Sequence, residues 1–488
     1  MPETTSRFPD RLQNLIGDAF KPAASGRWLK NLNPATGSEI CLLPDSGPED
    51  LNAAVVAASA AQAGWAAWAP EDRSALLNTI ADGLEAQLDE LARAESEDTG
   101  KPLSLSRSVD IPRAVQNFRF FAAGLLHVAS EAHARPGFLN VTLRPPLGVG
   151  ACISPWNLPL YLLSWKLAPA LATGNTVIAK PSEVTPLTAT LLAEICLKAG
   201  LPPGVLNLLH GTGAGVGDAI SGHQGIQAIS FTGSTATGSR IATLAAPRFA
   251  KLSLEMGGKN AAVIFADCDY ERMLETVLRS SFANQGQICL CTSRLLIESS
   301  IYERFRDDLV KRASALRVSD PLDPNTEQGA VVSAAHQQKI LSYVALARAE
   351  GGRILCGGEA VKLDGRCAEG WFVAPTVIEG LGPSCRCNRE EIFGPVVSLQ
   401  PFSSDDEALE LANASNYGLA ASLWTQNLSR TQRFGNTLEA GIIWVNCWMA
   451  RDLRTPFGGL RDSGLGREGG WDAFRFWTES KNICISDS

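Results

Sequence analysis

The strongest constraint on the fold is a series of four short apolar runs, at 149–154, 176–180, 205–209 and 228–231. Each run has the length of a strand, and the segments between the runs are typical of helices. Strands that alternate with helices in this way favour a parallel sheet with crossover helices. The pattern therefore predicts a doubly wound α/β domain of the nucleotide-binding kind.

A second alternation follows further along the chain, with strand-like runs at 261–265 and 372–378 and a helical region at 302–317. Near the start, the Ala-, Leu- and Glu-rich stretch 45–97 is typical of helices that flank a sheet. A chain of 488 residues is too long for one simple core. We therefore expect a second α/β domain after the first.

The composition excludes several classes of protein. A hydrophobic fraction of 45% and a charged fraction of 19% are typical of a soluble globular enzyme. The net charge of −8 argues against sequence-independent binding of nucleic acid, which needs a cationic field. The N-terminal residues 1–7 lead into a polar stretch without an apolar signal core, and no apolar segment approaches membrane-spanning length. We expect a cytoplasmic protein with no nucleic-acid or membrane partner.

Cysteine and histidine usage gives no sign of a metal site. The 12 cysteines are scattered through a long chain, so reduced thiols are expected rather than disulfides. The 5 histidines form no ligand motif, and we predict no structural metal. The same low count weighs against a Cys-His hydrolase or acyltransferase, an alternative class that would need no nucleotide cofactor.

One thiol stands where a nucleophile can be held rigidly. Cys289 follows a polar turn that contains Gly286, and Cys291 lies two residues further on. A lone cysteine is usually a small buried residue. Two other segments favour a reactive role: Glu255 stands next to a glycine pair, and the segment 233–238, with a glycine at each end, follows a predicted strand. The chain thus combines a nucleophile, a base and a candidate phosphate loop.

Together these segments resemble the aldehyde dehydrogenase family, from about Phe20 to near the C-terminus. The resemblance implies an α/β fold with a Rossmann-type NAD domain, an α/β catalytic domain and a small β element for oligomerisation, in a homodimer or homotetramer. The strand candidates at 137–144 and 482–486 would belong to that β element, although from composition they could equally be edge strands. The implied domains are 1–125 with 147–256 for NAD, 257–456 for catalysis, and 126–146 with 457–488 for oligomerisation.

The cofactor site is only partly readable from the residues. The turn at 233–238 could aim backbone N–H groups at a pyrophosphate, but neither the G-x-G-x-x-G fingerprint nor a Walker A motif is present. The resemblance assigns the phosphate contact to Ser234, with Gly233 and Trp156 in the same site. At the end of a predicted strand, Lys180 and Glu183 would lie where the adenosine ribose binds; without that strand they would be an ordinary solvated pair. Since Glu183 would repel a 2′-phosphate, NAD is expected rather than NADP.

A further segment, 390–395, matches the part of the family that holds the nicotinamide end of the cofactor. The resemblance implies that Glu391 binds the nicotinamide ribose and that Phe393 packs beside the nicotinamide. A Gly-Pro pair after an apolar residue is otherwise an ordinary turn.

The resemblance also supplies a residue for each chemical step. Cys289 would attack the aldehyde, while Cys291 occupies a position that varies in the family. Asn157 and the backbone N–H of the nucleophile would stabilise the oxyanion, and Glu255 would activate the water that hydrolyses the thioester. Because this glutamate is present, the free acid is the expected product. Lys166 and Glu468 match a pair thought to relay protons, but a structural ion pair is equally consistent.

Two segments, 110–121 and 446–459, resemble the muconic semialdehyde dehydrogenases. In that subfamily, arginines at the positions of Arg113 and Arg451 hold the substrate carboxylate remote from the aldehyde. An unpaired guanidinium is costly in a tunnel for neutral aldehydes, whereas a carboxylate repays that cost with bidentate bonds. The alternative is that both arginines sit on exposed helix and loop faces, as arginines usually do.

The expected function is NAD-dependent oxidation of 2-aminomuconic or 2-hydroxymuconic 6-semialdehyde to the dicarboxylate, within tryptophan or aromatic catabolism. A betaine-aldehyde or general aliphatic aldehyde dehydrogenase is the main alternative, and a non-enzymatic binding role is a further one. The sequence does not separate the amino from the hydroxy substrate, identify the contacts of that substituent, or separate dimer from tetramer.

Overall fold

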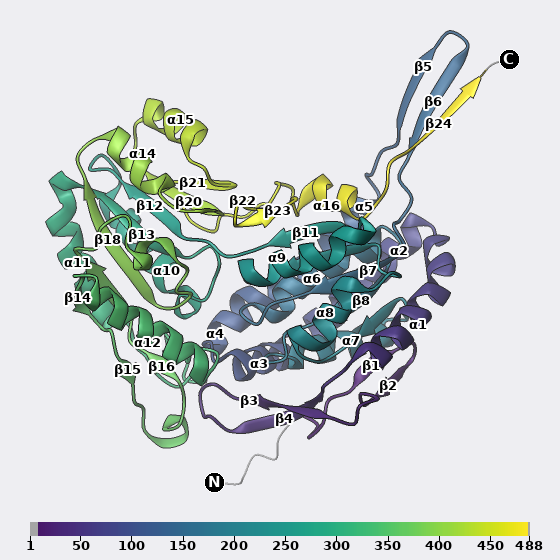
Figure 1. The fold of residues 1–488 in the computed structure, drawn as a ribbon, viewed down its shortest axis with the longest axis horizontal. Helices are drawn as coiled ribbons and strands as arrows, with labels where there is room; N and C mark the ends of the chain where they lie inside the picture. The colour runs from purple at the N-terminus through teal and green to yellow at the C-terminus, as the bar shows by residue number, and fades with distance from the viewer. Residues whose placement is uncertain (1–7, 487–488) are drawn as a thin grey trace.

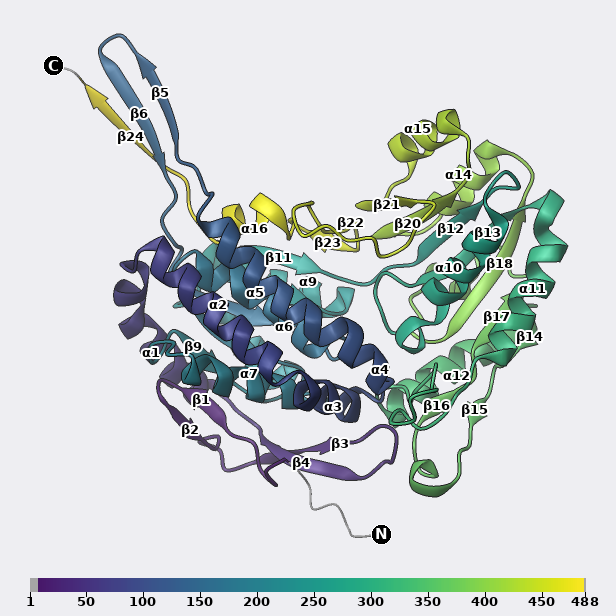
Figure 2. The ribbon, with the colours of Figure 1, turned by 180° about the vertical axis from the view of Figure 1, so that it is seen from behind.

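The computed structural model describes residues 8–486; the segment at 1–7, where no signal core was found, lies outside the described residues. The described chain forms two large α/β units, each built on one sheet, and a thin three-stranded arm that projects from the first unit (Figures 1 and 2). Within residues 8–486, no helix has the length and apolarity needed to cross a membrane.

The first unit is built on an eight-stranded sheet, counted within the described residues, in the order β2-β1-β9-β8-β7-β10-β11-β23. Its five central strands are parallel, and the expected strand 176–180 is confirmed at both ends. Alternate residues along β7 and β8 enter two separate apolar cores, so that helices cover both faces. The strands are β1 (Asn14–Ile16), β2 (Ala19–Lys21), β7 (Val149–Ile153), β8 (Thr176–Lys180), β9 (Leu206–Leu208), β10 (Ala228–Thr232), β11 (Lys251–Glu255) and β23 (Gly464–Leu465).

The helices of this unit confirm the helical composition of 45–97. One core packs against α2, α3, α5, α6, α7, α16 and the end of α1, and the other against the rest of α1, α8 and α9. The helices are α1 (Pro48–Ala66), α2 (Pro70–Ala86), α3 (Leu88–Thr99), α4 (Leu103–Leu105), the π-helix η1 (Ser106–Asp110), α5 (Ile111–Leu125), α6 (Pro159–Ala172), α7 (Leu187–Lys198), the π-helix η2 (Gly213–Gly217), α8 (Asp218–Gly222), α9 (Thr235–Ala245), the 3₁₀ turn η3 (Ala246–Arg248) and α16 (Gly470–Phe476).

The second unit has a seven-stranded sheet among the described residues, in the order β14-β17-β18-β13-β12-β20-β21, and only β14 runs antiparallel to its neighbour. Helices α10 and α11 pack on one face and α14 and α15 on the other. The strands are β12 (Asn260–Ile264), β13 (Thr292–Glu298), β14 (Arg353–Cys356), β17 (Thr376–Glu379), β18 (Val396–Phe402), β20 (Ala420–Trp424) and β21 (Ile442–Val445). The helices are α10 (Tyr270–Phe282), the 3₁₀ turns η4 (Ala283–Gly286), η5 (Ser299–Ile301) and η6 (Gly365–Cys367), α11 (Tyr302–Ala315), α12 (Ala334–Ala349), α13 (Arg386–Arg389), α14 (Asp405–Asn413) and α15 (Leu428–Thr437).

The prediction of one strand over 372–378 is wrong. The chain forms β16 (Phe372–Val373), which pairs with β15 (Ala360–Val361), and then the separate strand β17 in the large sheet. Pro375 lies between the two strands, and proline has no N–H to donate to a ladder. Two further short pairs are β3 (Trp28–Leu32) with β4 (Glu39–Pro44), and β19 (Tyr417–Gly418) with β22 (Leu460–Arg461).

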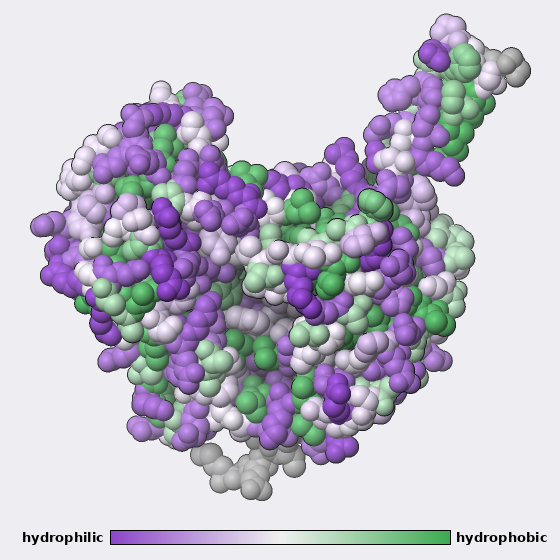
Figure 3. All heavy atoms as spheres, in the orientation of Figure 1, coloured by the Kyte–Doolittle hydropathy of each residue, from purple (hydrophilic) through white to green (hydrophobic). Residues whose placement is uncertain are grey.

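The arm consists of β5 (Glu131–Arg135), β6 (Phe138–Leu143) and β24 (Lys481–Ser486), in the order β24-β6-β5. The strand candidates at 137–144 and 482–486 therefore pair with each other, and neither lies at the edge of a large sheet. Every residue of β5 and β24 is exposed. Figure 3 shows apolar side chains along this projecting arm.

Candidate active site

The loop that carries the candidate nucleophile is shaped by three consecutive residues with positive φ. Asn284, Gln285 and Gly286 have φ of 52°, 56° and 69°. Asparagine and glycine are the residues that adopt this region at least cost. The loop turns the chain from α10 towards the junction of the two units, where an apolar cluster contributed by both units surrounds Cys289.

The backbone around this thiol is fixed by one amide. The side-chain N–H₂ of Asn260 donates to the carbonyl of Cys289 at 2.7 Å and to that of Cys291 at 2.9 Å. Only the first of these two thiols lines the cavity described next, while the second is buried and donates to the carbonyl of Ala283. Burial raises the pKa of Cys289, and the nearby carboxylates of Glu391 and Glu255 raise it further. The resting group is therefore a thiol rather than a thiolate.

A cavity of about 200 Å³ lies between the two units beside the thiol. It brings together seven residues that the sequence assigned to catalysis or cofactor binding: Trp156, Asn157, Gly233, Ser234, Cys289, Glu391 and Phe393. Its wall also contains Pro155, Thr232, Met256, Gly257, His336 and Lys339. Within residues 8–486, no three His, Cys, Asp or Glu side chains are grouped so that they could hold a metal ion.

The side chain of Asn157 is oriented by the nucleophile loop. Its amide nitrogen donates to the carbonyl of Gln287, two residues before Cys289, at 2.8 Å. An amide N–H₂ carries two donors. The second N–H is thus available to an oxygen atom bound at the thiol, as an oxyanion donor requires.

One end of the cavity is aromatic. The rings of Trp156 and Phe393 meet edge to face, with centroids 5.2 Å apart. His336 packs against Trp156 at 5.1 Å and donates from its ring to the carbonyl of Phe393 at 2.7 Å. Burial lowers the pKa of His336 to about 4, so the imidazole is neutral. The histidine supports Phe393 in an unusual backbone conformation, with φ of 60°.

Sequence reasoning missed His336 and Lys339. Both come from α12, where isolated polar residues on a helix carry no local signal of function. The sequence did assign Glu391, but it did not connect this residue with the glycine pair at 257–258, which contacts its carboxylate. Gly258 N–H donates to its carboxylate at 2.9 Å, and a Cβ on Gly257 would come within 2.3 Å of it. Burial raises the pKa of Glu391.

The turn at 233–238 opens α9. Ser234 is the N-cap of this helix and accepts a hydrogen bond from the N–H of Thr237 at 3.2 Å. A Cβ on Gly233 would lie 2.4 Å from the ring of Phe231, so only glycine fits without a shift. Both Ser234 and Gly233 face the cavity at a helix N-terminus, where partial positive charge favours an anion.

Lys180 and Glu183 lie away from the cavity wall, at the carboxyl end of β8. Their side chains form an ion pair of 3.1 Å, and the N–H of Gly213 also donates to the carboxylate. Burial raises the pKa of Glu183, but the Lys180 ammonium and these hydrogen bonds outweigh it, so the net pKa is lowered. Glu183 is therefore a carboxylate. The preceding strand β8 pairs at its end with the end of β7, the strand that leads to Trp156.

Glu255 is the last residue of β11 and is 3% exposed. Neither of its carboxylate oxygens has a hydrogen-bond partner in the part of the chain that the structure describes. Burial raises its pKa well above the ordinary value, and the nearby Glu468 adds to this. Lys166 and Glu468 form a buried ion pair of 2.7 Å, in which Ser230 bridges the two side chains. The carboxyl group is thus close enough to interact electrostatically with the thiol and with this pair.

The two arginines assigned to substrate binding lie around one tyrosine. Arg451 donates to the hydroxyl of Tyr161 at 3.0 Å, and the guanidinium of Arg113 lies over the same ring, 5.7 Å from its centroid. Both arginines are half-buried, not exposed. Neither has a carboxylate within ion-pair distance among residues 8–486. Arg451 also stacks on Phe457 at 4.1 Å, beside the cluster around the thiol.

Fold and site together define an enzyme with a candidate thiol nucleophile beside a doubly wound sheet of the nucleotide-binding kind. Comparison with known proteins identifies its family. Residues 20–483 match the model of the aldehyde dehydrogenase family, and the chain belongs to it. It is 50% identical to 2-aminomuconic semialdehyde dehydrogenase of Bos taurus, over 97% of this chain and 98% of the relative. It is 46% identical to 2-hydroxymuconic semialdehyde dehydrogenase of Pseudomonas sp. (strain CF600), over 97% and 99%. The solved structure of PnpE from Pseudomonas sp. WBC-3 matches with a TM-score of 0.95 at 39% identity, over 98% of each chain.

Proposed function

We propose that this enzyme oxidises a semialdehyde that carries a distal carboxylate, 2-aminomuconic or 2-hydroxymuconic 6-semialdehyde, to the dicarboxylate. The observation that carries the proposal is the pair Arg113 and Arg451, half-buried around Tyr161 without a carboxylate partner among the described residues. Desolvated guanidinium groups are costly unless they are paired, and a substrate carboxylate would pair them. Relatives named for both substrates support the assignment.

The cofactor of this reaction is NAD. Ser234 at the start of α9 would hold the pyrophosphate, Glu183 the adenosine ribose, and Glu391 with Phe393 the nicotinamide end. The cavity and the glycines that line it fit a flat ring beside Cys289. A carboxylate at Glu183 favours NAD over NADP because it would repel a 2′-phosphate. When bound, NAD would supply the hydride acceptor for the oxidation. Solved relatives in complex with NAD support this choice.

The residues of this chain divide the chemistry into two halves. In the first, the thiol of Cys289 releases its proton to water, its sulfur bonds to the aldehyde carbon, and the oxyanion that forms accepts from the free N–H of Asn157 and from the backbone N–H of Cys289. Loss of hydride leaves a thioester. In the second, Glu255 takes a proton from water, which attacks the thioester carbon and expels the thiolate. We assign Lys166 and Glu468 to the exchange of that proton.

The domain division also follows from the proposal. Residues 1–125 and 147–256 form the NAD domain and 257–456 the catalytic domain. We propose that residues 126–146 and 457–488 contain the oligomerisation element, which is the arm of β5, β6 and β24; β23 and α16 lie in the same range but pack with the first unit. The arm exposes apolar side chains that a monomer would leave in water: Phe138, Leu139, Leu143, Ile483 and Ile485. A homodimer or homotetramer in the cytoplasm is the assembly that would cover them.

A comparison of substrates tests the function. The purified enzyme should reduce NAD in the presence of a carboxylate-bearing semialdehyde with a kcat/KM at least about tenfold above that for a neutral aldehyde of equal length, because one charged hydrogen-bonded contact is worth about 2 kcal/mol or more. Equal efficiency on both would return the enzyme to the general aldehyde dehydrogenases. If neither aldehyde supports NADH formation, the proposal is refuted.

A further inference from the structure

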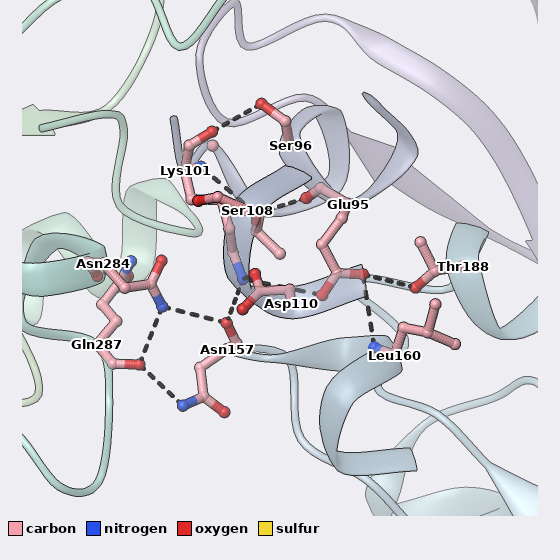
Figure 4. A network of polar contacts seen from close by, with 12 residues as sticks. Glu95, Ser96, Lys101, Ser108, Asp110, Asn157, Leu160, Thr188, Asn284 and Gln287 are labelled. Atoms are coloured by element: carbon pink, nitrogen blue, oxygen red, sulfur yellow. Dashed lines mark hydrogen bonds and ion pairs between the residues drawn. The ribbon is translucent and has the colours of Figure 1, made fainter. Parts of the chain in front are cut away.

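A buried ammonium group lies behind the candidate oxyanion hole. Lys101 follows α3 and is fully buried. Its Nζ donates to the carboxylate of Asp110 at 2.7 Å and to the backbone carbonyl of Asn157 at 2.9 Å (Figure 4). The ammonium therefore holds the main chain of the residue whose side chain faces the oxyanion.

The same carbonyl is held from a second side by the nucleophile loop. The amide nitrogen of Asn284 donates to the carbonyl of Asn157 at 3.1 Å and to that of Gln287 at 3.2 Å. Gln287 in turn accepts from the side chain of Asn157 at 2.8 Å. Figure 4 shows the resulting closed circuit, in which the loop before Cys289 and the oxyanion donor are bonded to each other, and Lys101 is bonded to the carbonyl of Asn157. A shift of the lysine would alter the separation of donor and sulfur.

The charges of this cluster are costly to bury. Asp110 and Glu95 are also buried, and a carboxylate oxygen of each has no hydrogen-bond partner within the described chain. Burial raises the pKa of Glu95 to about 7 and also raises the pKa of Asp110. Buried ion pairs contribute little to stability compared with apolar side chains of similar size. A buried charged cluster beside an active site is therefore better explained by a role in positioning the main chain of Asn157 than by a contribution to stability.

Asp110 connects the cluster to the substrate arginine. It is the last residue of the π-helix η1, and α5 begins at the next residue, which places Arg113 within one turn. Short π-helical segments are rare and are frequent at functional sites. One ammonium thus bonds both to the turn that carries the oxyanion donor and to the start of the helix that carries Arg113.

We propose that Lys101 is a positioning residue for the oxidation step: it sets the place of the Asn157 amide relative to Cys289 and, through Asp110, the place of α5. The proposal rests on the role given above to Asn157. A misplacement of catalytic groups by about 1 Å typically costs a rate factor of about 100. Lys101→Met should therefore slow the first turnover of hydride transfer about 100-fold and leave the Kd for NAD unchanged.

A double-mutant cycle separates positioning from a structural role. Asn157→Ala should slow the NADH burst by about 100- to 1000-fold. In that background the oxyanion amide is gone, so Lys101→Met should cost less than about threefold more. If the double variant slows the burst by the product of the two single-variant factors, the proposal is overturned, because a structural role acts independently of the amide. A normal burst in Asn157→Ala would instead refute the oxyanion assignment, and the lysine proposal would fall with it.

Two other variants keep the test decisive. Asn284→Gly removes the second donor to the carbonyl without burying a new charge, and glycine tolerates the positive φ at this position. It should slow the burst at least about tenfold even if Lys101→Met fails to fold. Arg73→Met is the matched control: Arg73 is buried and donates to the carbonyls of Ala172 and Trp68, outside the site. It should lower Tm without slowing the burst. Equal slowing in Arg73→Met, or a normal burst in both Lys101→Met and Asn284→Gly, would overturn the proposal.

Discussion

The most direct perturbation of substrate choice is Arg451→Met. Methionine keeps an unbranched apolar stem where the arginine packs on Phe457, and it removes only the guanidinium. Removing one partner of a desolvated charged pair costs about 2–5 kcal/mol. Here the lower half of that range applies, because Arg451 is only half-buried and both Arg113 and the hydroxyl of Tyr161 remain as donors. We expect a loss of about 2–3 kcal/mol, or roughly 30- to 150-fold in kcat/KM.

The assay compares two substrates in the same variant. NADH formation is followed with a carboxylate-bearing semialdehyde and with a neutral aldehyde of the same length. The loss should appear chiefly in KM for the charged substrate, because the arginine contacts a group remote from the reacting carbon. Oxidation of the neutral aldehyde should change little. If both substrates lose activity by the same factor, Arg451 supports the structure of the site, and the argument from the unpaired guanidinium fails.

Three further predictions follow from the site. Cys289→Ala should abolish turnover while NAD still binds, and Cys291→Ala should remain active, since only the first sulfur lines the cavity; steady-state NADH formation checks both, and the reverse pattern would move the nucleophile. Tyr161→Phe should raise KM for the carboxylate-bearing substrate about tenfold, as expected when one hydrogen bond to a charged group is lost, and an equal rise for a neutral aldehyde would contradict this. Glu255→Gln should give one NADH burst and an acyl adduct on Cys289 detectable by mass spectrometry; normal turnover without an adduct would mean that another base acts. Because burial raises the pKa of Glu255, its carboxylate forms only as pH rises through that raised pKa, so wild-type deacylation should increase with pH there and the variant should lack that limb. The raised pKa also makes folding stability depend on pH. The contribution of the neutral carboxyl group to the free energy of unfolding is fully present below the unfolded pKa and is lost as the pH rises towards the folded pKa. Glu255→Gln should therefore show a higher Tm than wild type at neutral pH.

Much of the fold could be predicted because strands of a parallel sheet are buried on both faces. The run at 176–180 is apolar between its first threonine and its final lysine, and its two ends were placed correctly. The run at 372–378 is similarly rich in apolar residues, but the prediction of one strand there was wrong. The physical difference is Pro375, which ends one short pairing and lets the next strand enter another sheet.

The parts of the site that could be predicted lie where the backbone makes unusual demands. Gly233 fits against the ring of Phe231, and Gly286 follows two other residues of positive φ. Such positions restrict the residue type, so they leave a local signature in the sequence. Glu255 ends β11 just before the glycine pair 257–258, and Cys289 follows the turn at Gly286, which is why the motifs around them could be recognised.

The residues that sequence reasoning did not reach are defined by long-range contacts alone. Lys101 reads as an ordinary polar residue after a helix, and only the fold brings it to a carbonyl 56 positions away in the chain. Tyr161 reads as one aromatic residue in an apolar helix, yet it lies between two guanidinium groups that come from 113 and 451. No local propensity requires either side chain. Their identity is set by partners that the chain supplies only after it has folded, and the same is true of the separation between Asn157 and the thiol. The chemical class of the site can therefore be read from motifs, whereas the fine placement of its donors and its preference for a charged substrate depend on contacts that no motif contains.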